Sequence, residues 1–249
     1  RMCLFVLIVQ HGVCPVPGEE ERTRTIRPNL VLILADDLGW GDLKAFHGES
    51  KIVTPALDRL ASEGVCFTDA HSTSSVCSPT RYSLLTGRYS WRSRLKRGVL
   101  GGLSPRLIEP GRMTLASMLK EEGYSTSCYG KWHLGMNWKV LPEKSVTELS
   151  VERPDQVWNV EYGEPFREGP TTLGFDRYFG IAASLDMVPY TFLENDRVAA
   201  LPTEDQVFAM VPAQPEKGMA RRGPTAPGFE PEQVLPELTK RVVGEIEAR

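Results

Sequence analysis

A continuous aliphatic run over residues 29–35 is followed at once by two carboxylates, Asp36 and Asp37. Such a run is typical of a strand that is covered on both faces, as in a parallel sheet. Ligand sites in open α/β sheets lie at the carboxyl ends of the strands, which is where the two carboxylates fall. Hard oxygen ligands of this kind favour Ca²⁺ or Mg²⁺. A plain turn before Gly39 is the alternative interpretation.

The next segment carries the start and stop signals of a helix. Thr54 is a typical N-cap, Pro55 suits the first helical position, and Gly64 follows the end. Residues 65–70 then predict a second strand, which leads through a serine-rich loop to Cys77.

The same alternation of helix and strand returns further along the chain. A helix is predicted over residues 114–122 and a strand over residues 124–129. A last helix is predicted from Pro236 onward, where apolar residues recur at helical spacing: Leu235, Leu238, Val242 and Ile246. The alternation predicts an α/β fold with a mixed, largely parallel sheet flanked by helices.

A cysteine and an arginine flank the start of a further short helix. Pro79 suits the first turn and Gly87 the position after the end, so we predict a helix over residues 79–86. Cys77 then lies at the helix N-terminus, where unsatisfied N–H groups and the helix dipole favour an anion. Arg81 adds a positive charge on the same side. The arrangement suits a tetrahedral oxyanion. For Cys77 itself, an activated thiolate and a buried structural cysteine both remain open.

Lys131 and His133 follow the predicted strand over residues 124–129. Two residues apart in an extended segment, their side chains project from the same side. A lysine can hold an oxyanion, and a histidine titrates near neutral pH and can transfer a proton. A purely structural histidine is the alternative.

Taken together, these segments resemble the type I sulfatases. Residues 77–81 (Cys-Ser-Pro-Thr-Arg), followed by residues 84–88 (Leu-Leu-Thr-Gly-Arg), are similar to the signature in which the cysteine is oxidised to formylglycine. Thr80 stands where serine is usual and keeps the hydroxyl. Residues 36–39 are similar to the first metal-binding motif of that family, and residues 130–135 to the segment that carries its lysine and histidine.

The resemblance implies an alkaline-phosphatase-like fold, with residues 28–249 as the N-terminal part of a catalytic domain. It implies sulfate ester hydrolysis through a formylglycine formed from Cys77 by a maturation enzyme, with a sulfated small molecule or sulfated glycan as substrate. The cofactor would be Ca²⁺, with Mg²⁺ as the other option. The implied catalytic residues are Cys77, Arg81, Lys131 and His133, and the implied metal ligands are Asp36, Asp37 and residue 77.

Two other functions remain open. A phosphonate or phosphate ester hydrolase of the same superfamily could use the same motif. A non-catalytic member could instead bind sulfated glycans. The resemblance also implies a leaving-group histidine at the position held by Leu185, and an Asp-Asn metal pair in the later half of the family's length, so the 249-residue chain is expected to be catalytically incomplete by itself.

Residues 1–27 resemble the end of a secretory signal peptide followed by a polar linker. The apolar run from Met2 to Val9 is too short to span a bilayer as a helix, so no stable membrane span is expected. A short buried strand is the alternative for that run. A signal peptide would place the protein in the secretory pathway, in a periplasmic, extracellular or lysosomal compartment.

The charge distribution argues against a nucleic-acid partner. The formal net charge is -3, and one short run of positive charges is too local to reverse it: Arg88, Arg92, Arg94, Lys96 and Arg97. We expect this run either to meet an anionic substrate or to be a solvated surface loop.

Overall fold

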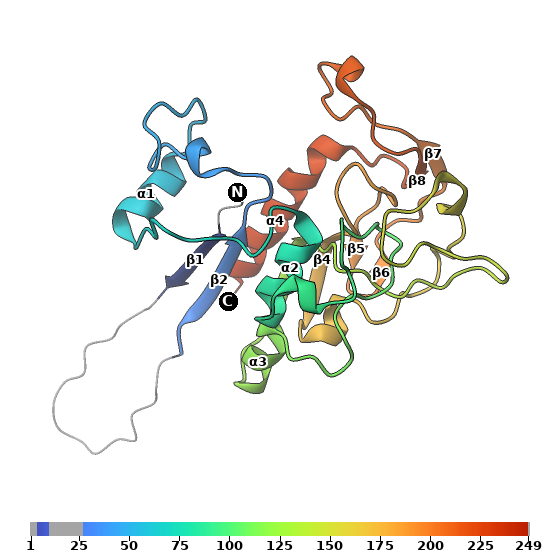
Figure 1. Ribbon diagram of the computed structural model, residues 1–249, viewed down its shortest axis with the longest axis horizontal. Coiled ribbons are helices and arrows are strands. Elements are labelled where there is room, and N and C mark those ends of the chain that lie inside the picture. Colours follow the sequence, from blue (N-terminus) through green and yellow to red (C-terminus); the bar gives the residue numbers. More distant parts are fainter. Residues whose placement is uncertain (1–3, 10–26, 249) are drawn as a thin grey trace. The chain divides into compact units, whose positions relative to one another are not determined.

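The computed structural model describes residues 4–9 and 27–248 (Figure 1). These residues fall into two compact units, one ending at Ser75 and the other beginning at Val76. The first unit holds the aliphatic run and the two carboxylates that follow it, and the second holds Cys77 and every later element.

In the first unit, the strand β1 (Leu4–Val9) pairs antiparallel with β2 (Asn29–Leu34), with Leu4 opposite Leu34. The prediction of a doubly covered parallel strand at residues 29–35 is therefore wrong in direction, and Leu30 and Ile33 are exposed. The alternative prediction for residues 2–9 is a strand, and β1 agrees with it over residues 4–9. Residues 2 and 3 lie outside the described residues. The signal-peptide interpretation concerns processing and stays a prediction.

The helix of the first unit confirms its sequence signals. After the short 3₁₀ turn η1 (Trp40–Asp42), the helix α1 (Pro55–Glu63) begins directly after Thr54 and ends before Gly64. The strand predicted over residues 65–70 does not form, and Val65 and Phe67 are 82% and 75% exposed. An apolar alternation stabilises a strand only where a partner strand is available to pair with it.

The second unit contains three helices, six strands and five 3₁₀ turns among its described residues. Its helices are α2 (Cys77–Thr86), α3 (Leu115–Glu121) and α4 (Val234–Glu247). Its strands are β3 (Ser127–Lys131), β4 (Arg177–Ile181), β5 (Leu193–Glu194), β6 (Arg197–Val198), β7 (Glu204–Gln206) and β8 (Gly223–Thr225). The 3₁₀ turns are η2 (Ser90–Arg92), η3 (Pro154–Gln156), η4 (Pro170–Leu173), η5 (Pro215–Lys217) and η6 (Pro231–Gln233).

Local signals explain where these helices start and stop. Helix α2 ends because Gly87 adopts a left-handed conformation (φ 62°) and its N–H bonds the carbonyl of Ser83 at 2.9 Å. Helix α3 begins because the Thr114 hydroxyl accepts the N–H of Ser117 at 3.0 Å. Both predicted helices are thereby confirmed, with α2 starting at Cys77 rather than at residue 79.

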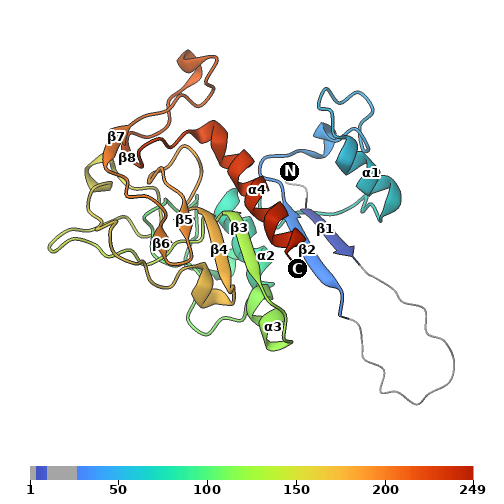
Figure 2. The ribbon, with the colours of Figure 1, turned by 180° about the vertical axis from the view of Figure 1, so that it is seen from behind.

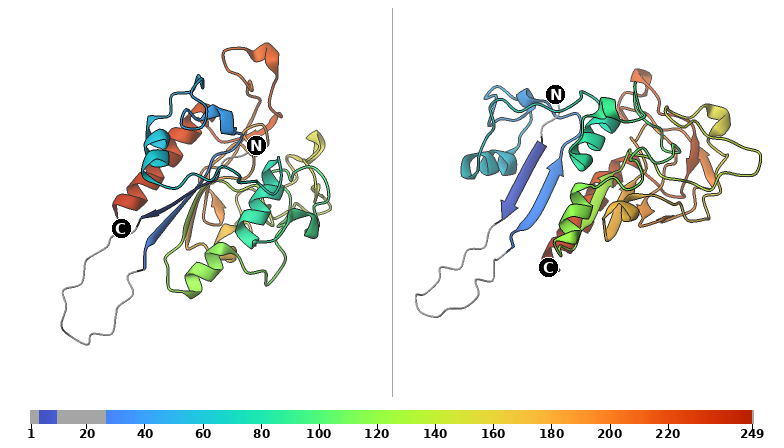
Figure 3. Two further views of the ribbon diagram at one scale, coloured as in Figure 1. Left: turned by 60° about the vertical axis from the view of Figure 1, so that its left-hand side comes forward. Right: turned by 60° about the horizontal axis from the view of Figure 1, so that its bottom comes forward.

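A mixed sheet of four strands, in the order β3, β4, β5, β6, organises the second unit (Figure 2). Strands β3 and β4 are parallel, with Lys131 opposite Ile181, and the other two pairings are antiparallel. Helix α4 covers one face of the β3 and β4 pair, while α2 and α3 lie on the other (Figure 3). The mixed α/β class is confirmed, and β3 and β4 form the only parallel pair of named strands in the described residues.

The core of the second unit lies largely on the α2 side of this sheet. Tyr178 of β4 packs there against Trp132, with ring centroids 6.2 Å apart. Trp138 meets Phe166 edge to face at 5.1 Å in the same cluster. A smaller cluster surrounds Tyr190 and reaches Val234 at the start of α4. No helix in the described residues is both long enough and apolar enough to cross a bilayer.

Candidate active site

Cys77 and Lys131 meet where α2 begins and β3 ends. Cys77 is the first residue of α2, so it lies among N–H groups that lack partners within the helix. Lys131 is the last residue of β3, and its Nζ lies 3.1 Å from the Cys77 Sγ. The two segments, more than fifty residues apart in sequence, therefore place an ammonium group beside the side chain of residue 77.

Arg81 ties the same two elements together from one turn further along α2. One of its terminal guanidinium nitrogens donates a hydrogen bond of 2.6 Å to the carbonyl of Lys131. The guanidinium thus fixes the end of β3 relative to the start of α2. The site carries two cations and a helix N-terminus around Cys77, which favours an anion there.

A second cysteine in this region has different properties. Burial raises the pKa of the Cys128 thiol to about 12, and the nearby charge of Arg81 opposes this only in part. Cys128 therefore remains a neutral thiol packed against the core. Cys77, at the helix N-terminus, is the cysteine in the position for chemistry.

His133 is fully buried just beyond β3, in a left-handed conformation with φ 55°. Its backbone N–H bonds the carbonyl of Ala182 at 2.9 Å, and its ring Nε2 lies 2.7 Å from the carbonyl oxygen of Leu100. Because a carbonyl only accepts, Nε2 carries the proton and donates it. In the neutral ring, Nδ1 is then the nitrogen that can accept a proton.

Leu100 links His133 to the first turn of α2. Its N–H donates to the hydroxyl of Ser78 at 3.2 Å, and its carbonyl accepts from His133. One peptide segment thus holds both the neighbour of Cys77 and the predicted base. The sequence motifs gave no sign of this connection, because it depends on a loop between them.

Glu152 supports the same loop and was not predicted from the sequence. It is 6% exposed, and its Oε1 accepts the N–H of Leu103 at 2.6 Å. Its Oε2 has no hydrogen-bond partner within the described residues. Burial raises the pKa of this carboxyl to about 7, against the opposing effect of the backbone hydrogen bonds. No local pattern marks a buried glutamate of this kind in the sequence.

The two predicted metal ligands lie in the first unit, directly after β2. Asp36 is half-buried, and Asp37 is exposed with φ 58°. Both carry the hard oxygen donors that Ca²⁺ or Mg²⁺ prefers. Residues 4–9 and 27–248 contain no group of three or more His, Cys, Asp or Glu side chains that could hold a metal ion. The donor chemistry of the two carboxylates fits a hard cation.

The position expected for a leaving-group histidine is held by an exposed leucine, Leu185. The next residue, Asp186, forms an ion pair with Arg221, with Oδ2 and a guanidinium nitrogen 2.5 Å apart. This part of the loop is therefore organised by a charged pair on the surface.

The chain belongs to the sulfatase family, whose profile matches residues 28–210. It is 39% identical over 181 residues to N-acetylgalactosamine-6-O-sulfatase from Bacteroides thetaiotaomicron, covering 73% of this chain and 32% of the relative. It is 41% identical over 170 residues to arylsulfatase G from Mus musculus, covering 67% of this chain and 26% of the relative. This chain therefore spans about a third of the first relative and about a quarter of the second.

A solved structure from Bacteroides thetaiotaomicron shares the fold. It is described under the metabolism of multiple glycosaminoglycans and is 31% identical to this chain, with a TM-score of 0.66. The match covers 86% of this chain and 46% of that chain. The alkaline-phosphatase-like fold expected from the sequence is consistent with this likeness.

Proposed function

We propose that the protein hydrolyses sulfate esters at residue 77. The observation that carries the proposal is the Lys131 Nζ at 3.1 Å from Cys77 Sγ, in a chain that belongs to the sulfatase family. The sulfur marks where a reactive group on the Cβ of residue 77 would lie. The ammonium of Lys131 and the helix N-terminus are then placed to stabilise the negative charge of a sulfate group.

In this proposal, a maturation enzyme with an external oxidant converts Cys77 to formylglycine, replacing the thiol by an aldehyde with loss of the sulfur. Water adds to the aldehyde, and the resulting hydrate is the nucleophile. One hydroxyl oxygen bonds to sulfur as the bond between sulfur and the alcohol oxygen breaks, and the proton of that hydroxyl leaves with the alcohol. His133 then accepts the proton of the second hydroxyl at Nδ1, sulfate leaves, and the aldehyde forms again. Arg81 keeps Lys131 in place by donating a hydrogen bond to the backbone carbonyl of Lys131.

Asp36 and Asp37 would hold a divalent cation, with Ca²⁺ favoured and Mg²⁺ as the other option. Their oxygen donors after β2 support this assignment. When bound, the cation would supply a positive charge that polarises a sulfate oxygen. The chain's own contribution is two carboxylates that balance the charge of the ion.

The substrate class is a sulfated small molecule or a sulfated glycan. The similarity to N-acetylgalactosamine-6-O-sulfatase and to arylsulfatase G supports both options. We place the protein in the secretory pathway, in a periplasmic, extracellular or lysosomal compartment, because residues 1–27 resemble a signal peptide and linker.

The decisive experiment combines mass spectrometry with turnover. The protein is produced with and without the maturation enzyme, and the peptide that carries residue 77 is weighed. Conversion of the thiol to an aldehyde should accompany hydrolysis of an aryl sulfate, and both should be lost in Cys77→Ala but kept in Cys66→Ala, which changes an exposed cysteine. An unmodified thiol at Cys77 in an active preparation would refute the mechanism. Faster turnover of an aryl phosphodiester than of the aryl sulfate would assign the site to phosphate esters instead.

A further inference from the structure

A pair of stacked aromatic rings stands on the surface just after α2. The rings of Tyr89 and Trp91 lie 4.1 Å apart at an interplanar angle of 12°. The two residues are 53% and 59% exposed. Burying such rings is favourable, so an exposed stacked pair marks a surface that a ligand can cover.

Cations accompany this pair without compensating acids nearby in the sequence. No Asp or Glu occurs between Asp69 and Glu109. Arg92 and Arg97 are exposed, and neither forms an ion pair or side-chain hydrogen bond with another described residue. Arg94 is partly neutralised, since it lies 3.7 Å from a carboxylate oxygen of Glu148. We call residues 88–97 the aromatic-basic segment.

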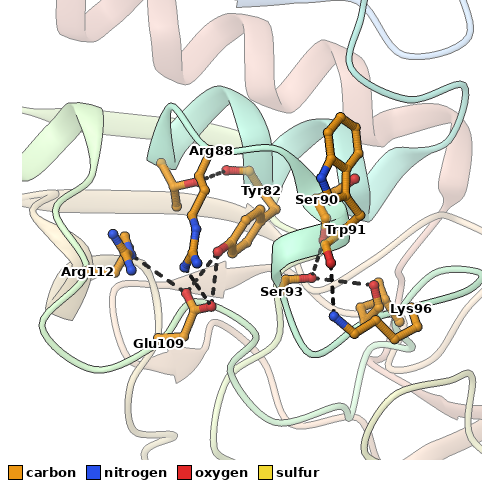
Figure 4. Close-up of polar contacts among 10 residues, drawn as sticks. Tyr82, Arg88, Ser90, Trp91, Ser93, Lys96, Glu109 and Arg112 are labelled. Atoms are coloured by element: carbon orange, nitrogen blue, oxygen red, sulfur yellow. Dashed lines mark hydrogen bonds and ion pairs between the residues drawn. The ribbon is translucent and has the colours of Figure 1, made fainter.

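The aromatic-basic segment is held in shape before any ligand binds. Ser93 and Leu95 are buried. The basic residues that alternate with them are exposed: Arg92, Arg94 and Lys96. The Ser93 hydroxyl donates to the carbonyl of Ser90 at 2.7 Å, and the Lys96 Nζ donates to the carbonyl of Trp91 at 2.9 Å (Figure 4). A surface ordered in advance loses less conformational entropy on binding.

The first residue of the segment is anchored to the body of the second unit. Arg88 lies 3.5 Å from Glu109, which also accepts the hydroxyl of Tyr82 at 2.9 Å (Figure 4). Beyond the last residue of the segment, the chain continues to Leu100, whose peptide group contacts Ser78 and His133. The aromatic-basic segment is therefore connected at both ends to elements of the candidate active site.

We infer that the aromatic-basic segment binds a sulfated polysaccharide chain. The apolar faces of sugar rings would pack on Tyr89 and Trp91, and sulfate groups would pair with Arg92 and Arg97, whose planar guanidinium groups match tetrahedral oxyanions. The choice of a sulfated glycan over another polyanion rests on the proposed function. Single-stranded nucleic acid also binds cations interleaved with aromatic rings, so the experiment must separate the two.

Binding is measured to heparin, to chemically desulfated heparin, and to a single-stranded oligonucleotide of similar charge, in a Cys77→Ala background where no turnover occurs. One variant removes the rings (Tyr89→Ala with Trp91→Ala), and a second removes the charges (Arg92→Gln with Arg97→Gln). The control changes an exposed arginine and tryptophan elsewhere in the second unit: Arg153→Gln with Trp158→Ala.

We expect heparin affinity to fall at least about tenfold in both segment variants and to stay within about twofold in the control. Desulfated heparin should bind weakly to all of them. The circular dichroism spectrum should be unchanged in all variants, which shows that they fold. Equal heparin affinity in the segment variants and the control would overturn the inference, as would an oligonucleotide that binds as tightly as heparin. Segment-dependent heparin binding without formylglycine at residue 77 after production with the maturation enzyme would refute the proposed function and support the binding surface.

Discussion

Replacing Glu152 by glutamine should stabilise the protein at neutral and alkaline pH. The carboxyl is 6% exposed, and only one of its oxygens has a hydrogen-bond partner in the described residues. In the wild type, the Glu152 carboxylate accepts the N–H of Leu103 at 2.6 Å. Glutamine has the same shape, and its side-chain carbonyl oxygen can accept the same hydrogen bond. The substitution therefore removes a buried charge while keeping the contact that the charge makes.

The magnitude follows from proton binding. Burial raises the pKa of Glu152 from 4.5 to about 7 in the folded protein. Between these two values the folded state binds more protons than the unfolded state, so the free energy of unfolding falls as pH rises through this interval and levels off above pH 7. A pKa difference of this size corresponds to about 3 kcal/mol.

Two neighbouring groups modify that value. Arg221 favours the ionised form of Glu152, and the carboxylate in turn contributes to the raised pKa of the buried Tyr162 hydroxyl. The glutamine amide group would also lie where Oε2 lacks a partner among the described residues, which costs about 1–2 kcal/mol. We therefore expect Glu152→Gln to raise the free energy of unfolding at pH 8 by about 1–2 kcal/mol and to give no gain near pH 4.5.

The assay is urea unfolding followed by tryptophan fluorescence at a series of pH values between 4.5 and 8.5. The difference between variant and wild type removes the contributions of all other groups. Glu148→Gln is the matched control, because Glu148 is exposed and its pairing with Arg94 spans 3.7 Å. A Glu152→Gln difference that does not change with pH, or a wild type that is more stable than the variant at pH 8, would refute this account of the buried carboxyl.

Four further substitutions test other parts of the structure. Arg81→Ala removes the hydrogen bond that fixes the end of β3 and should lower aryl sulfate kcat by about 10²-fold with a smaller change in KM, measured by steady-state kinetics. Asp37→Asn keeps a residue that tolerates φ 58° and should weaken Ca²⁺ binding about tenfold by calorimetry, with unchanged circular dichroism. Gly102→Ala should lower the free energy of unfolding, measured in urea, by about 2–4 kcal/mol, because the added carbon would lie 2.0 Å from the carbonyl oxygen of Val188. Gly244→Ala, at a helical position with open space around it, should raise the same free energy by about 0.5–1 kcal/mol.

Helix boundaries could be predicted from the sequence because their signals are local. Thr114 caps α3 with its own hydroxyl, and Gly87 ends α2 by its own conformation. Strand positions depend on partners that lie elsewhere in the chain. The strand predicted over residues 124–129 is displaced to Ser127–Lys131, where it pairs with β4, and residues 65–70 form no strand in the described structure.

The inward face of α4 shows a second limit of pattern reading. The predicted apolar stripe included Leu235 and Ile246, and both are exposed. Leu238 of the same stripe packs against the cluster around Tyr190. The inward face also carries Arg241, with its guanidinium carbon 4.2 Å from the centroid of the Phe179 ring. Glu245 also lies on this side and pairs with Arg177 at 2.7 Å. A hydrophobicity pattern assigns every charged residue to the solvent side, even one that pairs with a residue of the sheet. The pattern therefore leaves Arg241 and Glu245 out of the inward face of α4.

The candidate site divides along the same line between local and distant determinants. Cys77 and Lys131 could be found because each lies at a terminus of a helix or strand, where a side chain can project from a fixed backbone. The two side chains meet at 3.1 Å, and Arg81 of α2 also donates to the carbonyl of Lys131. The support beneath them could not be found in this way. Leu100 contributes only its peptide group to Ser78 and His133, and Glu152 acts through the backbone of the loop that contains Leu100. A contact made by a backbone N–H or carbonyl does not require a particular side chain, so it cannot be recognised in the sequence. The groups that orient this site are therefore harder to predict than the groups that react in it.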